Sequence, residues 1–431
     1  MSKQFFEERK MEQMEDAMKQ VKEAEELQKQ QAESGKPEIS FFKVVYRRHT
    51  NFAMESIEQT INGTVKPGNR LTSTVSRNGD LISNVYLEVD FGSTDTAKLF
   101  NSVGHALIEY VELEIGGQRI DKHYGEWMEI LSELTLPEEK RQGFKEMIGR
   151  RDAYIAGSSP LESNKLFIPL QFFFCKNPGL ALPLIALQYH EVKLNIKLRD
   201  LAEFSSLSSI NDFDVKLYVD YVYLDTTERR RFAQMQHEYL IEQLQHTGPA
   251  AGDEQTQRLN FNHPVKELVW VYRKASQPAT EKMNFSFSGG ANYIQYHNSL
   301  TGDAEQNGDV ANVVDPFLST SATDWFSSMK LQLNGHDRFS ERDVRYFRLV
   351  QPYQHHTRVP AKHVYCYSFA LNPEAHQPSG TCNFSRLDNV SMKFEFDSSK
   401  SVSSTDELLV YAVNYNVLRI MSGMGGLSYS N

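Results

Sequence analysis

HEVKLNIKL, at residues 190–198, alternates apolar and polar side chains from Val192 onward. DNVSMKFEF, at residues 388–396, repeats this alternation in the second half of the chain. A period of two places successive side chains on opposite faces of a strand, so each stretch has one face to bury. The two stretches therefore predict equivalent, half-buried strands in two halves of the chain.

Other segments recur in the same order, which indicates an internal repeat. The pairs are ELEIGG (112–117) with KLQLNG (330–335), FCKNP (174–178) with FALNP (369–373), and KLYVDYVYL (216–224) with LLVYAVNYNVL (408–418). Short helices are predicted at 124–134, at 340–349, and from the capping box that begins at Thr135 toward Gly149. Parallel sheets would show continuous apolar strands between regular helices, which this chain lacks.

We therefore expect an all-β chain of two tandem eight-stranded antiparallel jelly rolls, with short helices in the loops and an N-terminal helical arm. The expected boundaries are a charged arm at 1–38, a first jelly roll at 39–226, a linker at 227–257 and a second jelly roll at 258–431. Residues 135–165, 288–323 and 372–383 are polar and rich in turn residues, so they are expected as loop insertions.

The composition excludes several classes of protein. The 431 residues carry a formal charge of −10, the wrong sign for a protein that coats nucleic acid, so no direct nucleic-acid partner is expected. The Arg229–Arg231 run is accordingly assigned to a solvated or interface role. Only three cysteines occur, without CxxC spacing, which suits reduced thiols in a cytosol-like compartment. Neither a signal peptide nor a membrane span is expected.

No catalytic, cofactor-binding or metal-binding motif is found. The sequence contains no HExxH motif, phosphate-binding loop or GxSxG elbow. The one dense histidine group, His355, His356 and His363, is interpreted as ordinary loop and strand residues. The glycine-rich tail, SGMGGL at 422–427, opens no helix and is expected to be flexible or tightly turned.

The arm at residues 1–38 holds 7 basic and 10 acidic residues. Within it Met11, Met14, Met18 and Val21 recur at helical spacing. One interpretation is a solvated, partly helical arm, and the other is an arm that becomes ordered on a partner through this stripe. Four N-x-S/T sequons are possible glycan acceptors, at Asn62, Asn284, Asn383 and Asn389, although the motif is frequent by chance.

Five blocks carry a resemblance to a known family. They are residues 42–60 (FKVVYRRHTNFAMESIEQT), 76–82 (SRNGDLI), 223–233 (YLDTTERRRFA), 237–241 (HEYLI) and 416–426 (NVLRIMSGMGG). The chain resembles the major capsid proteins of nucleocytoplasmic large DNA viruses, the double jelly-roll family. The resemblance covers about residue 40 to the end, and the first 38 residues match nothing.

The resemblance implies a structural protein without enzymatic activity. It implies a homotrimer that forms a pseudo-hexagonal capsomer and tiles the icosahedral shell of a large DNA virus, with large loops on the outer side. The expected partners are further copies, neighbouring capsomers, and minor capsid or membrane-associated virion proteins reached by the arm. The expected location is the virion, after assembly in the host cytoplasm.

Two alternatives stay open from the sequence. A two-jelly-roll protein that binds or hydrolyses glycans would need paired carboxylates or aromatic platforms beside acids, for which Trp270, Trp325 and Asp324 are candidates. A penton or minor capsid protein is the other, although such proteins usually carry one jelly roll whereas this chain repeats.

Overall fold

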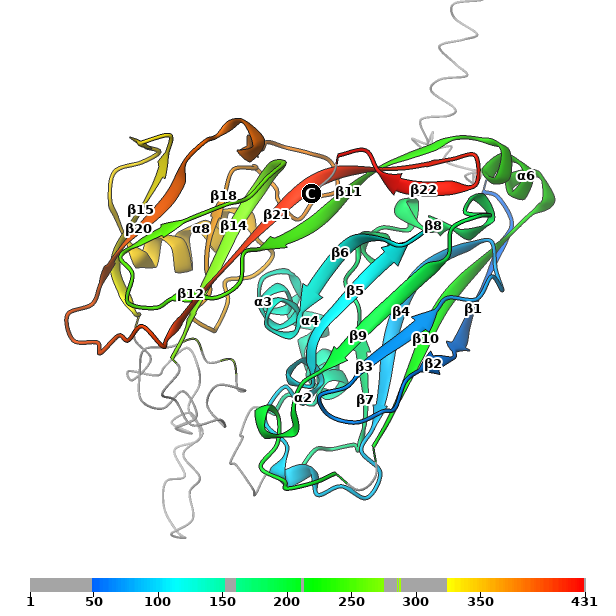
Figure 1. The fold of residues 1–431 in the computed structure, drawn as a ribbon, viewed down its shortest axis with the longest axis horizontal. Coiled ribbons are helices and arrows are strands. Elements are labelled where there is room, and N and C mark those ends of the chain that lie inside the picture. Colours follow the sequence, from blue (N-terminus) through cyan, green and yellow to red (C-terminus); the bar gives the residue numbers. More distant parts are fainter. Residues whose placement is uncertain are drawn as a thin grey trace, which may run out of the picture. The chain divides into compact units, whose positions relative to one another are not determined.

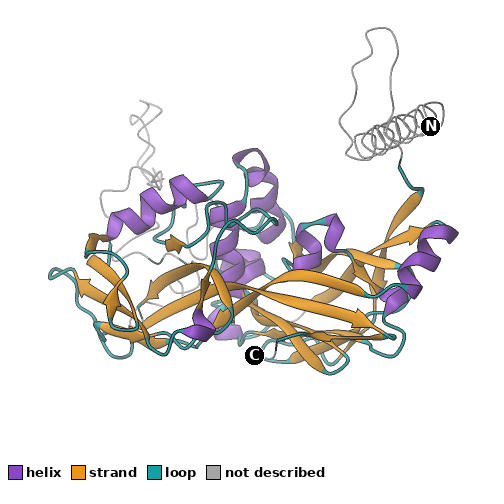
Figure 2. Ribbon diagram, turned by 90° about the horizontal axis from the view of Figure 1, so that it is seen from above, coloured by secondary structure: helices purple, strands orange, loops and turns teal. Residues whose placement is uncertain are grey.

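The structure is a computed structural model that describes residues 49–151, 160–210, 213–274, 285, 287 and 324–429. The chain divides into two units, Met1–Phe52 and Ala53–Asn431, and two β-sandwiches make up the second unit (Figure 1). The predicted arm stripe and the predicted loop at 288–323 lie outside the described residues. Figure 2 shows that strands form both sandwiches and that helices lie at their connections.

The first sandwich consists of two antiparallel sheets. One sheet has the order β1-β10-β4-β7, with β8 beside β4, and the other has the order β2-β3-β9-β5-β6. The strands are β1 (Phe52–Gln59), β2 (Ile61–Asn62), β3 (Arg70–Thr74), β4 (Leu81–Asp90), β5 (Ile108–Ile115), β6 (Gln118–Tyr124), β7 (Lys165–Pro169), β8 (Leu182–Pro183), β9 (Val192–Leu198) and β10 (Asp214–Leu224).

The second sandwich repeats this topology. Its sheets have the orders β11-β21-β14-β18 and β13-β20-β15-β16, with β12, β17, β19 and β22 pairing at the side. The strands are β11 (His237–His246), β12 (Ala250–Ala251), β13 (Thr256–Arg258), β14 (Pro264–Arg273), β15 (Phe326–Leu333), β16 (His336–Asp337), β17 (Arg342–Asp343), β18 (Tyr365–Ser368), β19 (Cys382–Asn383), β20 (Val390–Phe396), β21 (Glu407–Met421) and β22 (Met424–Leu427).

The repeat found in the sequence is a repeat of structure. The opening pair of stretches form β9 and β20, which pair with β5 and β15 at equivalent places in their sheets. KLYVDYVYL lies in β10, which pairs with β4, and LLVYAVNYNVL lies in β21, which pairs with the equivalent strand β14. The predicted pair of tandem antiparallel jelly rolls is confirmed.

Helices occupy the connections. They are α2 (Val103–Ala106), α3 (Gly125–Thr135), α4 (Glu138–Ile148), α5 (Phe173–Lys176), α6 (Thr226–Gln234), α8 (Gln351–His355), the π-helical turn η5 (Tyr346–Val350), and the 3-10 turns η1 (Thr96–Lys98), η2 (Pro178–Leu180), η3 (Leu184–Ala186), η4 (Leu201–Glu203) and η6 (Phe384–Arg386). The helices predicted at 124–134 and toward Gly149 are confirmed as α3 and α4.

Two local predictions need correction. The Thr135 hydroxyl does not cap α4: it donates to the Leu131 carbonyl at the end of α3, and Pro137 is the N-cap of α4. The helix predicted at 340–349 begins later, because residues 342–343 pair with β15 as β17, and helix then runs from Tyr346 to His355 as η5 and α8.

The segment predicted as a linker, 227–257, contains regular structure. It holds most of α6 and then the ten residues of β11, which pair antiparallel with β21 from His237↔Ile420 to His246↔Tyr411. Both faces of β11 are partly covered, so its sequence lacks the clean alternation of a half-buried strand. Residues 237–246 thus form an edge strand of the second sandwich.

Candidate functional site

The most extensively built polar site in the described chain is the contact between the two sandwiches. Its centre is α3, where Glu126, Glu129 and Glu133 recur at spacings of three and four and therefore share one helix face. All three side chains are buried, Glu129 and Glu133 completely. The helix lies close to the preceding chain because Gly125 has no side chain: a Cβ there would come within 2.3 Å of the His105 and Ile108 carbonyl oxygens.

Each of these glutamates meets a cation from the second sandwich. Arg273 Nη1 lies 2.9 Å from Glu126 Oε1, Lys362 Nζ lies 2.5 Å from Glu129 Oε1, and Arg358 Nη2 lies 3.1 Å from Glu133 Oε2. The Arg358 backbone N–H also donates to the Leu134 carbonyl, 3.1 Å away. The two sandwiches are therefore joined by three buried ion pairs along one helix.

Basic side chains of the first sandwich complete the network. Arg199 Nη2 donates to Glu126 Oε1 over 2.5 Å, His105 Nδ1 lies 2.6 Å from Glu129 Oε2, and Arg150 pairs with Glu133. Burying an unpaired charge costs several kcal/mol, so such carboxylates persist only where each is paired and hydrogen-bonded. The network makes the contact dependent on both sandwiches.

The acidity of these groups follows from their surroundings. Burial by itself raises the pKa of Glu133, but the charges of Arg150, Lys362 and Arg358 outweigh it and lower the pKa to about 2. Burial also opposes ionisation of Glu126 and Glu129, and neighbouring cations lower the pKa of both carboxyls. The face of α3 is therefore anionic at neutral pH.

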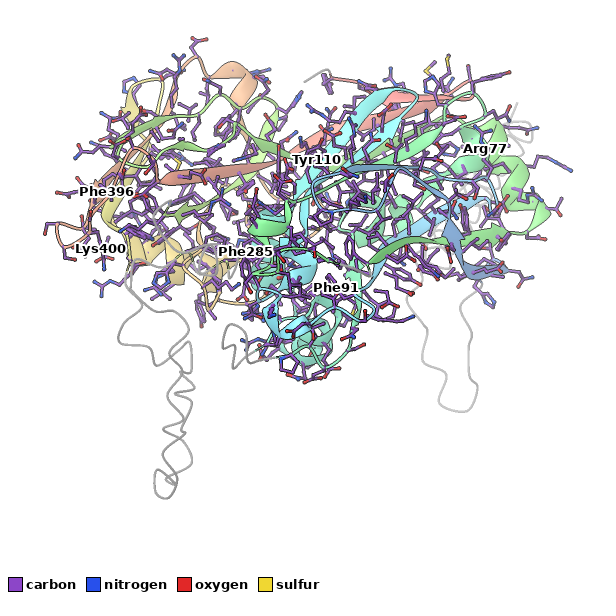
Figure 3. The ribbon with its side chains drawn as sticks, turned by 60° about the horizontal axis from the view of Figure 1, so that its bottom comes forward. Arg77, Phe91, Tyr110, Phe285, Phe396 and Lys400 are labelled. Carbon is purple, nitrogen blue, oxygen red and sulfur yellow. The ribbon has the colours of Figure 1, made fainter. Side chains whose placement is uncertain are left out.

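Apolar side chains surround the ion pairs. Along β14, Val269 and Val271 belong to the core of the first sandwich, whereas Trp270 and Tyr272 belong to the core of the second. Tyr411 of β21 also faces the first core, with its ring centroid 5.3 Å from that of Trp127 on α3. The central strands of the second sandwich are thus buried on both faces, and side chains fill the space between the ribbons in Figure 3.

Two strand edges meet at the same contact. Gln243 of β11 donates through Nε2 to the Ile120 carbonyl of β6, and the Leu244 N–H donates to Asp121 Oδ1, 3.0 Å away. Because side chains rather than a backbone ladder join β6 to β11, each edge is covered without fusing the sheets.

Glu242 of β11 lies between Lys176 and Lys266. Burial by itself raises the pKa of this carboxyl, but the charges of the two lysines outweigh it and lower the pKa to about 2.

The C-terminal hairpin adds a third connection. β21 turns at Ser422 and Gly423, both with positive φ, into β22, so of the two expectations for this tail the structure shows the tight turn. The Gly423 carbonyl accepts a hydrogen bond of 2.9 Å from the Tyr189 N–H. Leu427 N–H donates to Gln118 Oε1 over 3.2 Å. The end of the second sandwich is thereby bound to the first.

Comparison with known proteins identifies this architecture. The family model for "Large eukaryotic DNA virus major capsid protein" matches residues 228–426, and that for "Major capsid protein N-terminus" matches residues 40–225. The chain is 48% identical to the major capsid protein of Pyramimonas orientalis virus, over 92% of this chain and 96% of that protein. It belongs to the major capsid proteins of large eukaryotic DNA viruses.

Further relatives agree. The chain is 42% identical to the major capsid protein of Paramecium bursaria Chlorella virus 1, over 92% of this chain and 96% of that protein. The crystal structure of PBCV-1 VP54 superposes with a TM-score of 0.75 at 40% identity, covering 91% of this chain and 100% of that one. The Faustovirus major capsid protein, at 12% identity, shares the fold with a TM-score of 0.68, covering 89% of this chain and 93% of that one.

The family membership makes this chain a structural component of the virion capsid, and the family is not enzymatic. Assembly of a capsid from its major protein implies association with further copies. The boundary between the two family models, at residues 225 and 228, coincides with the start of α6. The second family model therefore includes β11, in agreement with its pairing.

The residues considered for glycan chemistry serve the core of this capsid protein. Trp270 and Trp325 are buried, with 0% and 2% of their surfaces exposed, so neither forms a platform. Asp324 accepts hydrogen bonds from Arg348, at 2.9 and 3.1 Å, and from the Tyr365 hydroxyl, at 2.9 Å. The Asp324 carboxylate is thus held by hydrogen bonds within the second sandwich.

The remaining predicted residues are scattered. Asn62, Asn383 and Asn389 are exposed, Asn284 lies outside the described residues, and whether any sequon carries a glycan stays a prediction. Met11, Met14, Met18 and Val21 lie outside the described residues as well.

The histidine group does not converge on one point. His355 Nδ1 lies 2.9 Å from the Leu371 carbonyl, and His363 lies 3.8 Å from Asp324. His356 lies between Glu374 at 2.9 Å and Glu267 at 3.3 Å. Across the described ranges, no three side chains of histidine, cysteine or acid type gather as a metal site would require. None of the helices in that same part of the chain combines the length and apolar character needed to cross a membrane.

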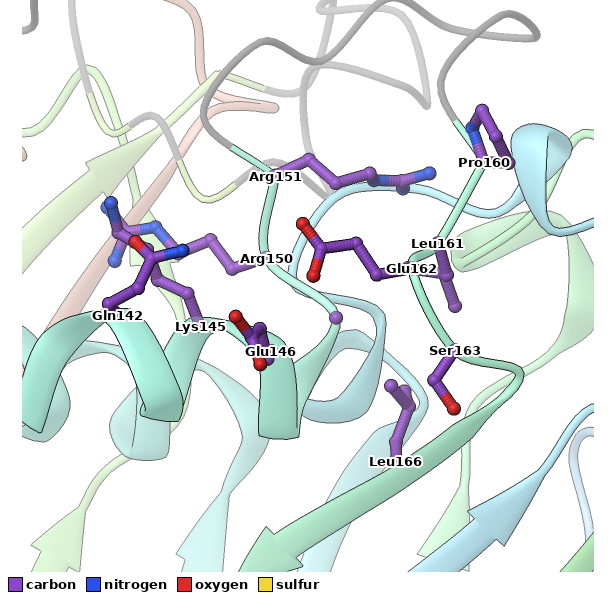
Figure 4. A pocket seen from close by; sticks show the side chains of 11 residues that line it. Gln142, Lys145, Glu146, Arg150, Arg151, Pro160, Leu161, Glu162, Ser163 and Leu166 are labelled. Atoms are coloured by element: carbon purple, nitrogen blue, oxygen red, sulfur yellow. The ribbon is translucent and has the colours of Figure 1, made fainter.

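A pocket of about 280 Å³ lies beside α4 (Figure 4). Arg150 and Arg151 line it together with Glu146 and Glu162. Both arginines are engaged, Arg150 with Glu133 and Arg151 with the Leu99 and Phe100 carbonyls at 2.7 and 2.9 Å. Their guanidinium groups therefore serve the fold.

Sequence reasoning missed the acidic face of α3. Glu126, Glu129 and Glu133 stand at helical spacing inside a predicted helix, and acids on the core-facing side of an otherwise apolar helix are an available signal. Their partners Lys362 and Arg358 are more than two hundred residues away in the sequence, and nothing local to those positions indicates the pairing.

Proposed function

We propose that three copies of this major capsid protein form a homotrimeric capsomer of pseudo-hexagonal outline, and that these capsomers tile the icosahedral shell of a large DNA virus. The observation that carries the proposal is the repetition of one sandwich topology twice in a chain. Three chains around a threefold axis bring together six similar sandwiches. A ring of six such units has a hexagonal outline, and this outline packs a surface with hexagonal symmetry.

The proposal requires that the two sandwiches of one chain keep a fixed relation, because two sandwiches that moved independently could not define a hexagonal outline. Three buried ion pairs on α3, the shared core around Tyr411 and the C-terminal hairpin all support such a fixed contact. The apolar alternation along β14 supports it as well, since separating the sandwiches would expose Val269 and Val271 to water.

The same proposal includes partners and a place of assembly. The arm at 1–38 would bind minor capsid or membrane-associated virion proteins through Met11, Met14, Met18 and Val21. The net charge of −10 argues for protein partners rather than nucleic acid. The cysteine usage, with all three thiols free in the structure, supports assembly in the host cytoplasm.

Electron microscopy of the purified full-length protein in negative stain tests the capsomer directly. The expected class averages are closed rings with six lobes and threefold symmetry. Averages that show single bilobed particles, or open chains of lobes, would contradict the proposal.

A further inference from the structure

The two sandwiches differ in what covers one equivalent face. The outward face of the β11-β21-β14-β18 sheet is covered by the first sandwich, where Val269 and Tyr411 enter the core around α3. The corresponding sheet of the first sandwich, β1-β10-β4-β7, has no such cover among the residues described, and Phe167 on its outward face is 39% exposed. Among the described residues, one copy of a repeated face is thus covered within the chain and the other is open.

The open face carries an aromatic row, formed by Tyr86, Phe167 and Tyr218. Tyr86 and Tyr218 are register partners on the two central strands, with ring centroids 5.2 Å apart in a stacked arrangement. The Phe167 centroid lies 6.4 Å from that of Tyr86. Val269 and Tyr411 are likewise register partners on the central strands of the second sandwich. The outward face of a solvated antiparallel sheet is ordinarily polar, so an aromatic row there favours an interface.

The rim of the aromatic row is mainly acidic. Glu58 of β1 accepts from the Tyr218 hydroxyl over 3.3 Å. Glu88 and Asp90 follow Tyr86 on the same face of β4 and share the single cation of Lys165, at 3.7 and 3.3 Å. Lys216 pairs with Glu58, 3.7 Å away. Three carboxylates therefore stand against two ammonium groups.

The second sandwich has a counterpart of α3 that is half uncovered. α3 lies between β6 and β7, and the continuous helix of η5 and α8 occupies the equivalent connection between β17 and β18. One side of this helix is buried through Phe347, in the core of its own sandwich. The other side presents a helical patch of Leu349, Val350 and Tyr353, with exposed fractions of 40%, 39% and 80%.

We propose, resting on the trimer of the proposed function, that the helical patch of one copy covers the aromatic row of the next copy. This contact would repeat between chains what α3 does within the chain. Each copy offers one patch and one row, so the contact is heterologous, and under the threefold rotation of the proposed trimer it closes into a ring. Exposed Arg342, which lies over the Tyr346 ring, flanks the helical patch and suits the acidic rim. Arg345 beside it is already paired with Asp343. Within the chain the signs are reversed, with acids on α3 and bases on β14 and on the connection that precedes β18.

Engineered disulfides test the pairing of surfaces. A chain carrying both Tyr353→Cys and Tyr218→Cys is expected, after mild oxidation, to give covalent dimers and trimers on a denaturing gel and nothing larger. Each single variant should stay monomeric on that gel. The matched control combines Tyr218→Cys with Tyr189→Cys, because Tyr189 is 76% exposed but lies outside the patch. Cross-linking in the control without cross-linking in the test pair would overturn the inference.

A charge substitution gives an independent readout. Tyr353→Glu places a carboxylate opposite the acidic rim and is expected to raise the concentration at which the trimer dissociates at least tenfold, with an unchanged melting temperature of the monomer. Tyr353→Arg should raise this dissociation concentration much less, and Tyr189→Glu should leave it unchanged. If Tyr353→Glu assembles like the unmodified chain, the inference is wrong while the trimer stands. A chain that never trimerises in its unmodified form would overturn both.

Discussion

Lys362 Nζ lies 2.5 Å from Glu129 Oε1, and the two side chains come from different sandwiches. Lys362 is 2% exposed and Glu129 is 0% exposed, so the pair is shielded from water. Because an unpaired buried carboxylate is costly, the pair exists only while the sandwiches are in contact. Substituting either of these two side chains therefore tests whether the two sandwiches are held in a fixed relation.

Replacing Lys362 should therefore destabilise the whole chain. Lys362→Met approximates the length of the side chain but removes the cation from Glu129, which keeps His105, Arg150 and the Ser102 hydroxyl as partners. We expect a loss of about 3 kcal/mol in the free energy of unfolding. Urea unfolding followed by tryptophan fluorescence measures it. The control is Lys330→Met, which removes a partly exposed pair with Asp337 and should leave the midpoint unchanged. Equal effects of the two substitutions would refute the special role of the buried pair.

Acid should loosen the contact between the sandwiches. Glu133 and Glu242 both have a pKa of about 2, below the ordinary value of 4.5. A depressed folded-state pKa means that their contribution to stability is complete above about pH 4.5 and is lost as the pH falls from there toward 2. Unfolding free energies measured at intervals between pH 7 and pH 3 should fall steeply below pH 4.5. Glu133→Gln should be less stable at pH 7 and show a shallower fall, and a slope equal to that of the unmodified chain would contradict this account.

His356 should give a dependence of the opposite sign. Burial disfavours its charged form, but contacts with Cys366, Glu267 and Glu374 raise its pKa to about 12. A raised folded-state pKa means that its contribution is complete below the ordinary value of 6.5 and is lost as the pH rises from 6.5 toward 12. Proton NMR of the imidazole should show no titration between pH 5 and pH 9. His356→Gln should reduce the loss of stability between pH 7 and pH 9.5, and a normal titration of His356 near pH 6.5 would contradict the assignment.

Gly125 should tolerate no side chain. In Gly125→Ala the added Cβ would collide with two backbone carbonyl oxygens, 2.3 Å away, so we expect little folded protein in the soluble fraction. Gly143 in α4 has nothing within 4 Å of a Cβ, so Gly143→Ala should raise stability by about 0.5–1 kcal/mol through helix propensity. Thermal melts of both variants decide the matter, and a Gly125→Ala chain that melts like the parent would show that the approach of α3 is not tight.

Removing the arm should separate folding from incorporation. Deleting residues 1–36 is expected to leave the trimer and its melting temperature nearly unchanged, because that segment cannot bury a core by itself. Incorporation into shells should fall when the truncated chain competes with the full chain during infection. Failure of the truncated chain to trimerise would instead make the arm part of the fold.

The architecture could be predicted from the sequence because it is marked by periodic signals, namely the alternation along strands and the repeat between the two halves. The alternation in β9 and β20 and the ordered repeats fix two antiparallel sandwiches, and α3 and α4 were predicted within a few residues. β11 was missed because a strand that is partly covered on both faces loses its alternation. The ion pairs of α3 were missed for a different reason: pairing over more than two hundred residues depends on tertiary contact, which leaves no local pattern.

The central claim is that three chains, each with two sandwiches in a fixed relation, assemble as a closed trimer. Light scattering coupled to gel filtration of the full-length protein measures this most directly. The account predicts one species with three times the chain mass of 49.5 kDa, unchanged on dilution through the micromolar range. A stable species of one or two chain masses at micromolar concentration would contradict it.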